Sequence, residues 1–197
     1  MIKRICICLL GLVIMGFGIA AMRVVNLGLD PFGAMILGIS YRTGISFGTT
    51  IWIVHSPIFV IMLFRARRLI GIGTILGMFV VGYAIDFFYY IASVLELEPG
   101  LFVRVVALVP ALVVFAFGIA LYMVADVGTV PYDSCGVMIE DATKGRVKFK
   151  WGRIGMDAIC LVVAFVLGAT LGVGTVLPVV TLGPLISFFR KRLGNDV

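Results

Sequence analysis

Charged and titratable side chains are rare inside the long apolar segments of this 197-residue chain, so each one is a candidate for chemistry. His55 lies near the middle of one apolar run, and Arg153 and Asp157 lie four residues apart in another. Because an unpaired charge inside a membrane is costly, such residues are kept for a function or as an ion pair. We expect His55 and Asp157 to contribute to a ligand or ion site, with the imidazole able to titrate near neutral pH. The alternatives are a hydrogen bond from His55 to a backbone carbonyl and a structural Arg153–Asp157 pair on one helix face.

Five further polar residues lie where apolar segments end or are interrupted. Asp86 lies in the outer half of a predicted span, where it either binds a cation or a substrate amine or is hydrated at the interface. Asn26 and Asp126 follow two corresponding spans, and their positions favour capping of free backbone groups. Asp30 is a natural N-cap of one short helix, and Asp133 lies in the first turn of a second. If either helix begins inside the protein, its N–H groups could hold an anionic part of a substrate, unless Asp30 and Asp133 already occupy them.

The sequence lacks the common motifs of enzymes, metal sites and nucleotide sites. It has no Ser/His/Asp triad signature and no H-E-x-x-H motif, and the glycine-rich turns at 71–77 and 168–174 lack a Walker lysine. The four cysteines show no zinc-ligand or C-x-x-C spacing: Cys6, Cys8, Cys135 and Cys160. We therefore expect no enzymatic activity, no metal and no cofactor. The net charge of +6 is gathered at the ends of apolar segments, which favours orientation in a membrane over nucleic-acid binding.

The elements that must position these residues are transmembrane helices. The chain is 62% hydrophobic and 13% charged, with a mean hydropathy of +1.20, so its solvent is the lipid bilayer. We predict one all-α polytopic membrane domain over residues 1–197, with six spans at about 5–23, 47–64, 69–92, 102–124, 151–169 and 172–189. A short helix follows the first span of each half, at 31–41 and 131–142. A helix of about 11 residues at about 1.5 Å each cannot cross a hydrocarbon core of about 30 Å, so it lies at the interface or dips in and returns.

The two halves of the chain repeat one another. The segment from Gly16 to Ala20 recurs from Ala116 to Ala120, and Gly28 and Pro31 recur as Gly128 and Pro131. The repeat predicts an internal duplication, with one copy at about 5–92 and the other at about 102–189. Because three spans is an odd number, the second copy must enter the membrane from the opposite face. Such an inverted-topology repeat is typical of transporters, although some channels share it.

The distribution of basic residues predicts the orientation. With a cytoplasmic N-terminus, the inside segments contain the clusters at 3–4, 65–68, 144–150 and 190–192, whereas the outside segments contain Arg23, Arg42 and Arg104. This bias follows the positive-inside rule. We expect both termini in the cytoplasm of a cell with the chain in its inner membrane, and the loop that contains Glu96 and Glu98 outside.

Several motifs resemble one bacterial family. They run in order from Gly28 to Gly33, from Arg42 to Thr49, from Gly71 to Thr74 and from Gly82 to Phe88. On these motifs the chain resembles the YczE/YyaS/YitT group of integral membrane proteins, specifically its YczE branch. It departs from relatives that carry a tryptophan and an acid after the proline, since Phe32 and Gly33 stand there. The resemblance implies a bacterial inner-membrane protein and small-molecule transport.

Three functions remain open from the sequence. The first is a small-molecule transporter that works alone or as a homodimer, with His55 and Asp157 near a polar cavity between the halves. The second is a substrate-binding membrane subunit of a vitamin-type uptake system, energised by a partner ATPase that docks on a small-residue stripe of Gly11, Gly18 and Ala21. The third is a non-transporting accessory protein of a biosynthetic or secretion system. For transport, the missing nucleotide site favours coupling to protons, mainly through His55, or to the gradient of the substrate.

Overall fold

The computed structural model describes residues 1–97 and 99–194, and over these residues the chain is entirely helical. The first half contains α1 (Ile2–Val25), α2 (Pro31–Thr43), α3 (Phe47–Arg65), a single 3-10 turn η1 (Arg67–Leu69) and α4 (Ile72–Val94). The second half contains α5 (Leu101–Val124), α6 (Pro131–Ala142), α7 (Phe149–Val166) and α8 (Val173–Leu193). Glu98, which the charge bias predicts outside, lies beyond the described residues.

Five of these helices are long and apolar enough to cross a membrane: α1, α3, α4, α5 and α8. The predicted all-α membrane fold is therefore confirmed. The helix α7, which corresponds to the predicted span at about 151–169, is not among the five, and it carries Arg153 and Asp157 along its length. The last helix runs beyond its predicted end because Arg190, Lys191 and Arg192 form its final turn, where cations interact favourably with the helix dipole.

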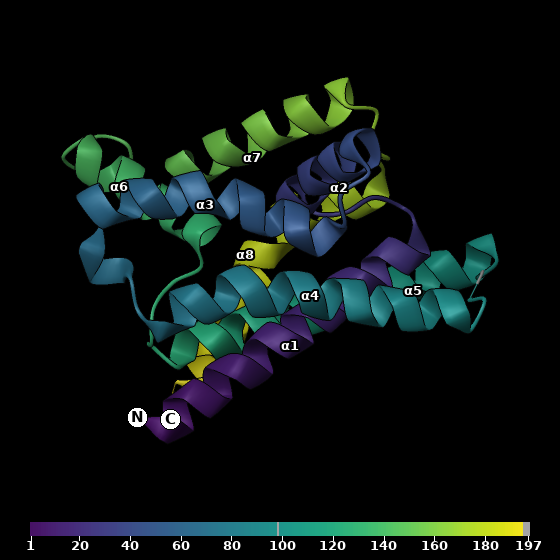
Figure 1. Cartoon of the computed structure of the whole chain (residues 1–197), viewed down its shortest axis with the longest axis horizontal. Coiled ribbons are helices and arrows are strands. Elements are labelled where there is room, and N and C mark those ends of the chain that lie inside the picture. The colour runs from purple at the N-terminus through teal and green to yellow at the C-terminus, as the bar shows by residue number, and fades with distance from the viewer. Residues whose placement is uncertain (98, 195–197) are drawn as a thin grey trace.

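The centre of the fold is the crossing of α1 and α5 (Figure 1). Gly11 of α1 lies against Tyr122, and Gly18 lies against Phe115, so the two helices run antiparallel. A Cβ atom on Gly18 would come within 2.6 Å of the backbone nitrogen of Phe115. Glycine is therefore required at this crossing, because any side chain would push the two backbones apart. Two further helices pack on this pair, α4 against α1 and α8 against α5.

The short helices pack across the halves. Helix α2 of the first half contacts α7 of the second half, and α6 of the second half contacts α3 of the first half. In Figure 1 these four helices lie along the upper side of the molecule, above α1, α4 and α5. The helices that carry the predicted site residues His55, Arg153 and Asp157 are therefore held together by contacts between the two halves.

The segment after the first helix of each half is bonded to the last helix of the other half. The carbonyl of Leu27 accepts a hydrogen bond from the N–H of Gly174 at 2.8 Å, and that of Val127 accepts one from Gly73 at 2.8 Å. The aromatic contacts recur in the same way. The rings of Phe17 and Phe88 meet edge to face at 5.2 Å between centroids, and those of Phe117 and Phe189 at 5.4 Å. The two halves thus repeat one another in these hydrogen bonds and aromatic contacts as well as in sequence.

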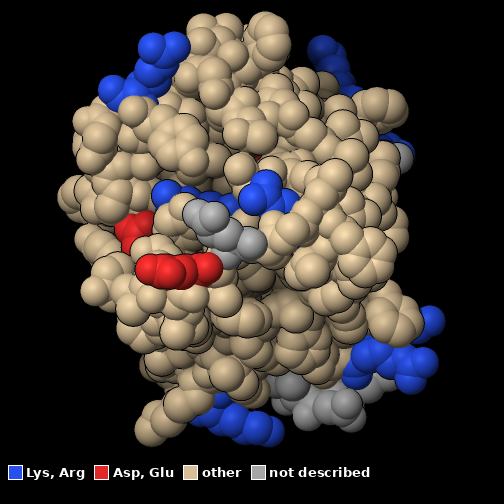
Figure 2. Space-filling model, turned by 90° about the vertical axis from the view of Figure 1, so that its right-hand side faces the viewer, with Lys and Arg blue, Asp and Glu red and all other residues tan. Residues whose placement is uncertain are grey.

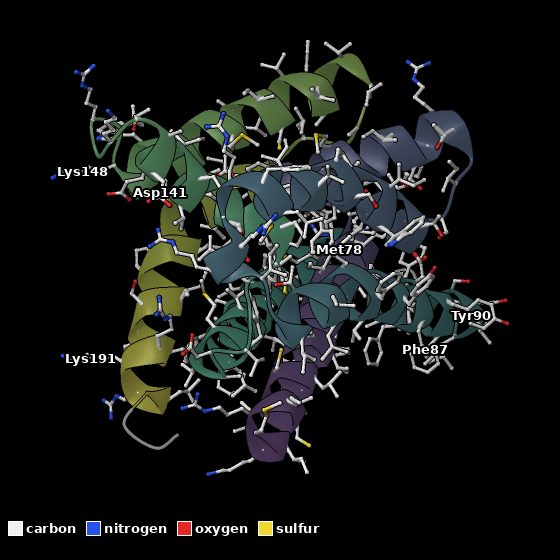
Figure 3. The ribbon with its side chains drawn as sticks, turned by 60° about the vertical axis from the view of Figure 1, so that its left-hand side comes forward. Met78, Phe87, Tyr90, Asp141, Lys148 and Lys191 are labelled. Atoms are coloured by element: carbon white, nitrogen blue, oxygen red, sulfur yellow. The ribbon has the colours of Figure 1, made fainter. Side chains whose placement is uncertain are left out.

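The two ends of the molecule differ in charge. In Figure 3, Asp141, Lys148 and Lys191 lie at one end, whereas Phe87 and Tyr90 lie at the opposite end, with Met78 between them. The first end also contains the end of α3 at Arg65 and the final basic turn of α8.

Candidate functional site

The first turns of α2 and α6 meet inside the protein. Pro31 and Pro131 begin these helices, as the fixed φ of proline favours, and the next residues, Phe32 and Tyr132, stack with 4.3 Å between their ring centroids. Phe32 and Tyr132 occupy the same position in the two repeats. Their contact therefore lies where the two halves meet, and it brings together the side chains that surround both helix N-termini.

A column of planar groups extends on both sides of this contact. The ring of His55 from α3 stacks on Phe32 with 5.2 Å between centroids and an interplanar angle of 6°. On the other side, the guanidinium of Arg153 from α7 lies over the Tyr132 ring at 4.5 Å. Four helices thus each contribute one member of the column, and the two outer members are residues that the sequence singles out.

The second half supplies a paired charge network. Nη1 of Arg153 lies 2.6 Å from Oδ1 of Asp133, and its Nε lies 3.5 Å from Oδ1 of Asp157. The hydroxyl of Tyr122 donates a hydrogen bond to Asp133, and that of Tyr132 donates one to Asp157. One guanidinium therefore serves two carboxylates, and each carboxylate also has a tyrosine partner. Such charges are tolerated away from water because they are paired and hydrogen-bonded.

One expectation about this network is confirmed and one needs correction. The predicted pair between Arg153 and Asp157 exists, and Arg153 makes a shorter contact with Asp133. Asp133 was expected in the first turn of α6, where it could occupy the free N–H groups. The N-cap of α6 is Val130, without a side-chain cap, and the carboxylate of Asp133 is turned toward Arg153, with a side chain 12% exposed. The sequence could not locate Tyr122, the hydroxyl of which comes from α5.

The first half supplies polar groups that lack partners. Asp30 caps α2 as predicted, since its Oδ2 accepts a hydrogen bond from the N–H of Gly33 at 3.3 Å. Its Oδ1 is buried and has no hydrogen-bond partner within the described part of the chain. Both ring nitrogens of His55 are also buried without a hydrogen-bond partner in the described part of the chain, so neither bonds a backbone carbonyl there. Unsatisfied buried polar atoms are uncommon in folded proteins and require an explanation such as a missing ligand or proton.

The other predicted residues lie elsewhere. Asp86 accepts a hydrogen bond from the N–H of Gly48 at 2.9 Å and forms an ion pair with Arg23 at 3.8 Å.

Asn26 and Asp126 have left-handed backbones with φ of 51° and 49°, and their backbone N–H groups bond the last turns of α1 and α5. Each lines a surface cavity, about 700 Å³ beside Asn26 and about 600 Å³ beside Asp126. From the sequence, Arg23 was assigned only as a positive charge on the outer side of the membrane, because the residues that contact it lie much later in the chain.

The site therefore contains five of the eight predicted residues: His55, Asp30, Asp133, Arg153 and Asp157. Among the described residues, no group of three or more His, Cys, Asp or Glu side chains is arranged to hold a metal ion. The arrangement can bind a proton or a small polar ligand at Asp30 and His55, next to a charge network that is already satisfied.

Comparison with known proteins agrees with this membrane fold. Residues 2–191 match the Family of unknown function (DUF6198). The chain belongs to this family. It is 28% identical over 179 residues to the uncharacterized membrane protein YczE of Bacillus subtilis (strain 168), a match that covers 90% of this chain and 81% of the relative. The resemblance to YczE-type membrane proteins is thus confirmed.

Two further relatives cover most of their own length. An uncharacterized protein of Haemophilus influenzae is 26% identical over 193 residues, which covers 98% of this chain and 86% of the relative. The uncharacterized protein YyaS of Bacillus subtilis is 26% identical over 183 residues, with 91% and 89% covered. No solved structure matches the chain.

Proposed function

We propose that this chain is a small-molecule transporter of the bacterial inner membrane. The observation that carries the proposal is the meeting of the two repeated halves at a buried polar site, where Phe32 stacks on its repeat counterpart Tyr132. Transporters built from repeats bind substrate between the halves, near the N-termini of interrupted helices. Here both short helices begin at that point, Asp30 and His55 are buried beside it, and Asp133, Asp157 and Arg153 are partly buried.

The proposed architecture has six spans in two inverted-topology repeats, with both termini in the cytoplasm. The antiparallel crossing of α1 and α5, which are the first helices of the two repeats, supports inversion. Helix α7 serves as the sixth span, with Arg153 and Asp157 turned toward Asp133 and Tyr132 rather than left unpaired. The basic end with Lys148 and Lys191 faces the cytoplasm in this arrangement.

The proposed cycle uses the difference between the halves. Substrate or a coupling proton binds at the ring nitrogens of His55 and at Oδ1 of Asp30, which have no hydrogen-bond partner among the described residues, while the network of Asp133, Arg153 and Asp157 keeps the second half rigid. Exchange of roles between the halves then opens the site to the other face. The proposal involves no enzymatic step, cofactor or metal, and the energy comes from a proton gradient or from the gradient of the substrate.

The test begins with thermal-shift screening of metabolites on the purified protein, followed by uptake of a hit into proteoliposomes. We expect His55→Gln to fold normally and to lose uptake driven by a pH gradient, while downhill exchange continues. A matched control is Asp141→Asn, an exposed residue that pairs with Arg68 at the surface. If His55→Gln still concentrates substrate in response to a pH difference, the coupling group is not His55.

The structure weakens one alternative function. A subunit that docks on a partner ATPase would need a free small-residue stripe, for which Gly11, Gly18 and Ala21 are the candidates. Gly11 and Gly18 lie against α5, at Tyr122 and Phe115, so these two members of the stripe serve the internal helix crossing. A non-transporting accessory protein gains no support from the contacts among the described residues, and co-purification of a soluble partner would favour it.

A further inference from the structure

A second polar site lies at the end of the molecule where α1 and α4 finish and α5 begins. A cavity of about 700 Å³ opens there, and we call it the α1–α4 cavity. Its polar lining residues are Arg23, Asn26, Tyr41, Tyr89, Ser93 and Arg104, together with Glu96. The volume is within the range of small-molecule pockets, about 300–1,000 Å³. In Figure 2, which looks onto this end, basic and acidic side chains gather near the middle of the face, and further basic side chains lie around its rim.

Arg23 is the buried cation of this cavity. Its side chain is 12% exposed, and its guanidinium lies 3.8 Å from the centroid of the Tyr89 ring and 5.1 Å from that of Phe47. The two rings hold the plane of the guanidinium in place, as cation–π contacts do. A stacked guanidinium leaves its edge, with the N–H donors, available for a ligand.

The donors of Arg23 are poorly satisfied within the protein. Its Nε is buried and has no hydrogen-bond partner among residues 1–97 and 99–194. Its ion pair with Asp86 measures 3.8 Å between Nη1 and Oδ1, which is longer than a hydrogen bond. Asp86 in turn accepts a hydrogen bond from the N–H of Gly48 at 2.9 Å. Among the described residues, the partly buried Arg23 thus has neither a bidentate carboxylate nor a partner for Nε, which are the acceptors that its geometry suits.

We propose that the α1–α4 cavity binds an oxyanion, the carboxylate or phosphate of a small molecule or of a lipid headgroup, through the guanidinium of Arg23. A planar guanidinium matches such groups with two parallel hydrogen bonds. Asn26, Ser93 and Arg104 add donors around the cavity, whereas Glu96 adds one negative charge. The ligand is therefore a singly charged or zwitterionic compound rather than one with several negative charges. This site is separate from the transport site and does not rest on the proposed function.

The repeat offers an internal comparison for this site. A corresponding cavity of about 600 Å³ lies between α5 and α8, lined by Val124, Asp126 and Ser187 among others. Its counterpart of Arg23 is Met123, and its counterpart of Asp86 is Ser187. The repeat has thus kept the hollow at both positions, but the second copy has Met123 at the position of Arg23, and the basic residues of its cavity, Arg4, Arg190 and Lys191, come from other positions. A packing role shared by both copies would not require the buried charge of Arg23.

The experiment uses purified full-length protein in a non-ionic detergent. Thermal unfolding is followed with inorganic phosphate or acetate against chloride at equal ionic strength, and with dioctanoyl phosphatidylglycerol against dioctanoyl glycerol. The first arm detects a soluble oxyanion, and the second detects a lipid headgroup. We expect stabilisation in at least one arm, and a dissociation constant raised by about tenfold or more in Arg23→Gln, as for a lost charge-assisted hydrogen bond.

Three further variants make the result decisive. Arg23→Lys keeps the charge without the planar fork and should also bind more weakly, whereas Glu96→Gln should bind more tightly. Arg42→Gln, an exposed arginine whose Nε donates to the carbonyl of Leu167, is the matched control and should bind as the wild type does. If Arg23→Gln alone does not fold because it leaves Asp86 unpaired, Arg23→Gln with Asp86→Asn replaces it. The proposal is overturned if neither probe stabilises the protein, or if stabilisation persists without the guanidinium.

Discussion

Between the first and the second half of the chain, glycines and aromatic contacts recur whereas charged residues do not. Gly28 and Gly128 both have positive φ, 104° and 120°, at the breaks after α1 and α5. The edge-to-face contact of Phe17 with Phe88 recurs as that of Phe117 with Phe189. In contrast, the positions that correspond to Asp133, Arg153 and Asp157 are occupied by Gly33, Ile51 and His55.

The difference separates residues that form the fold from residues that form the site. Both halves must bring helix backbones close together and turn the chain after the first helix, so both need the same glycines. Polar groups inside a membrane protein are energetically costly, so each half retains only the polar residues that have a structural or functional role. The second half has satisfied its charges with Tyr122 and Tyr132, whereas the first half leaves Asp30 and His55 with free atoms. In the proposed transport function, the second half supplies the rigid part of the site and the first half binds the ligand.

The largest effect should come from the glycines that both halves share. A Cβ on Gly118 would lie 2.4 Å from the backbone nitrogen of Met15, and one on Gly18 would lie 2.6 Å from that of Phe115. We expect Gly118→Leu and Gly18→Leu to cost about 3 kcal/mol or more each, or to prevent folding, because α1 and α5 must separate. The measurement is the yield of monodisperse protein in detergent, followed by thermal unfolding.

The control for the glycines is Gly155→Leu, since nothing lies within 4 Å of a Cβ at that position. Gly155→Leu should leave both the yield and the melting temperature close to those of the wild type. Equal losses in the two crossing variants would agree with a packing role shared by the halves. A well-folded Gly118→Leu protein would contradict the close crossing.

A smaller effect should appear in the charge network of the second half. Arg153→Gln removes the cation that lies between Asp133 and Asp157. Leaving a fully buried charge unpaired costs about 3–5 kcal/mol, and because the Arg153 side chain is 29% exposed we expect a smaller loss of about 2 kcal/mol. The surface pair Arg68–Asp141, with side chains 66% and 45% exposed, supplies the control. Arg68→Gln should cost less than about 1 kcal/mol, since exposed ion pairs contribute little.

Thermal unfolding in detergent compares these two variants. Adding Asp133→Asn to Arg153→Gln should restore part of the loss, because it removes one of the unpaired carboxylates. Equal melting temperatures for Arg153→Gln and Arg68→Gln would mean that the network does not stabilise the second half.

The helices could be predicted from the sequence because their signals are local. Apolar length gave the long helices, and Asp30 followed by Pro31 gave the start of α2, which begins at Pro31. The repeat also placed the breaks after α1 and α5 at corresponding positions, and there the carbonyls of Leu27 and Val127 accept equivalent hydrogen bonds. These features depend on residues close in sequence or on the duplication itself.

The polar site could be predicted only in part, because its partners come from distant helices. The spacing of Arg153 and Asp157 predicted their pair, since both lie on one helix. Asp133 was expected only to occupy the N–H groups of its own helix, because the sequence of α6 does not reveal that Tyr122 and Arg153 contact its carboxylate. Arg23 was missed for the same reason, because Tyr89 and Asp86 reach it only after α1 and α4 have packed together.

The smallest change in stability is expected at His55, the residue on which the proposed function depends. Its side chain is buried, and its two nitrogens lack partners among the described residues, so folding already includes the cost of desolvating them. Leucine is apolar and of similar size, and it removes that cost while it still contacts Phe32. We expect His55→Leu to change the free energy of unfolding by less than about 1 kcal/mol, or to raise it.

The control for His55 is another buried residue of the same helix. Ile51 is 3% exposed, and Ile51→Ala should cost about 2–5 kcal/mol by leaving a cavity in the core. Thermal unfolding and proteoliposome uptake are measured on both variants. A protein that gains stability but loses transport has lost a group kept for function, since binding sites hold polar atoms that folding alone would not retain. If His55→Leu loses as much stability as Ile51→Ala, the imidazole is part of the packed core, and the difference between the halves is structural rather than functional.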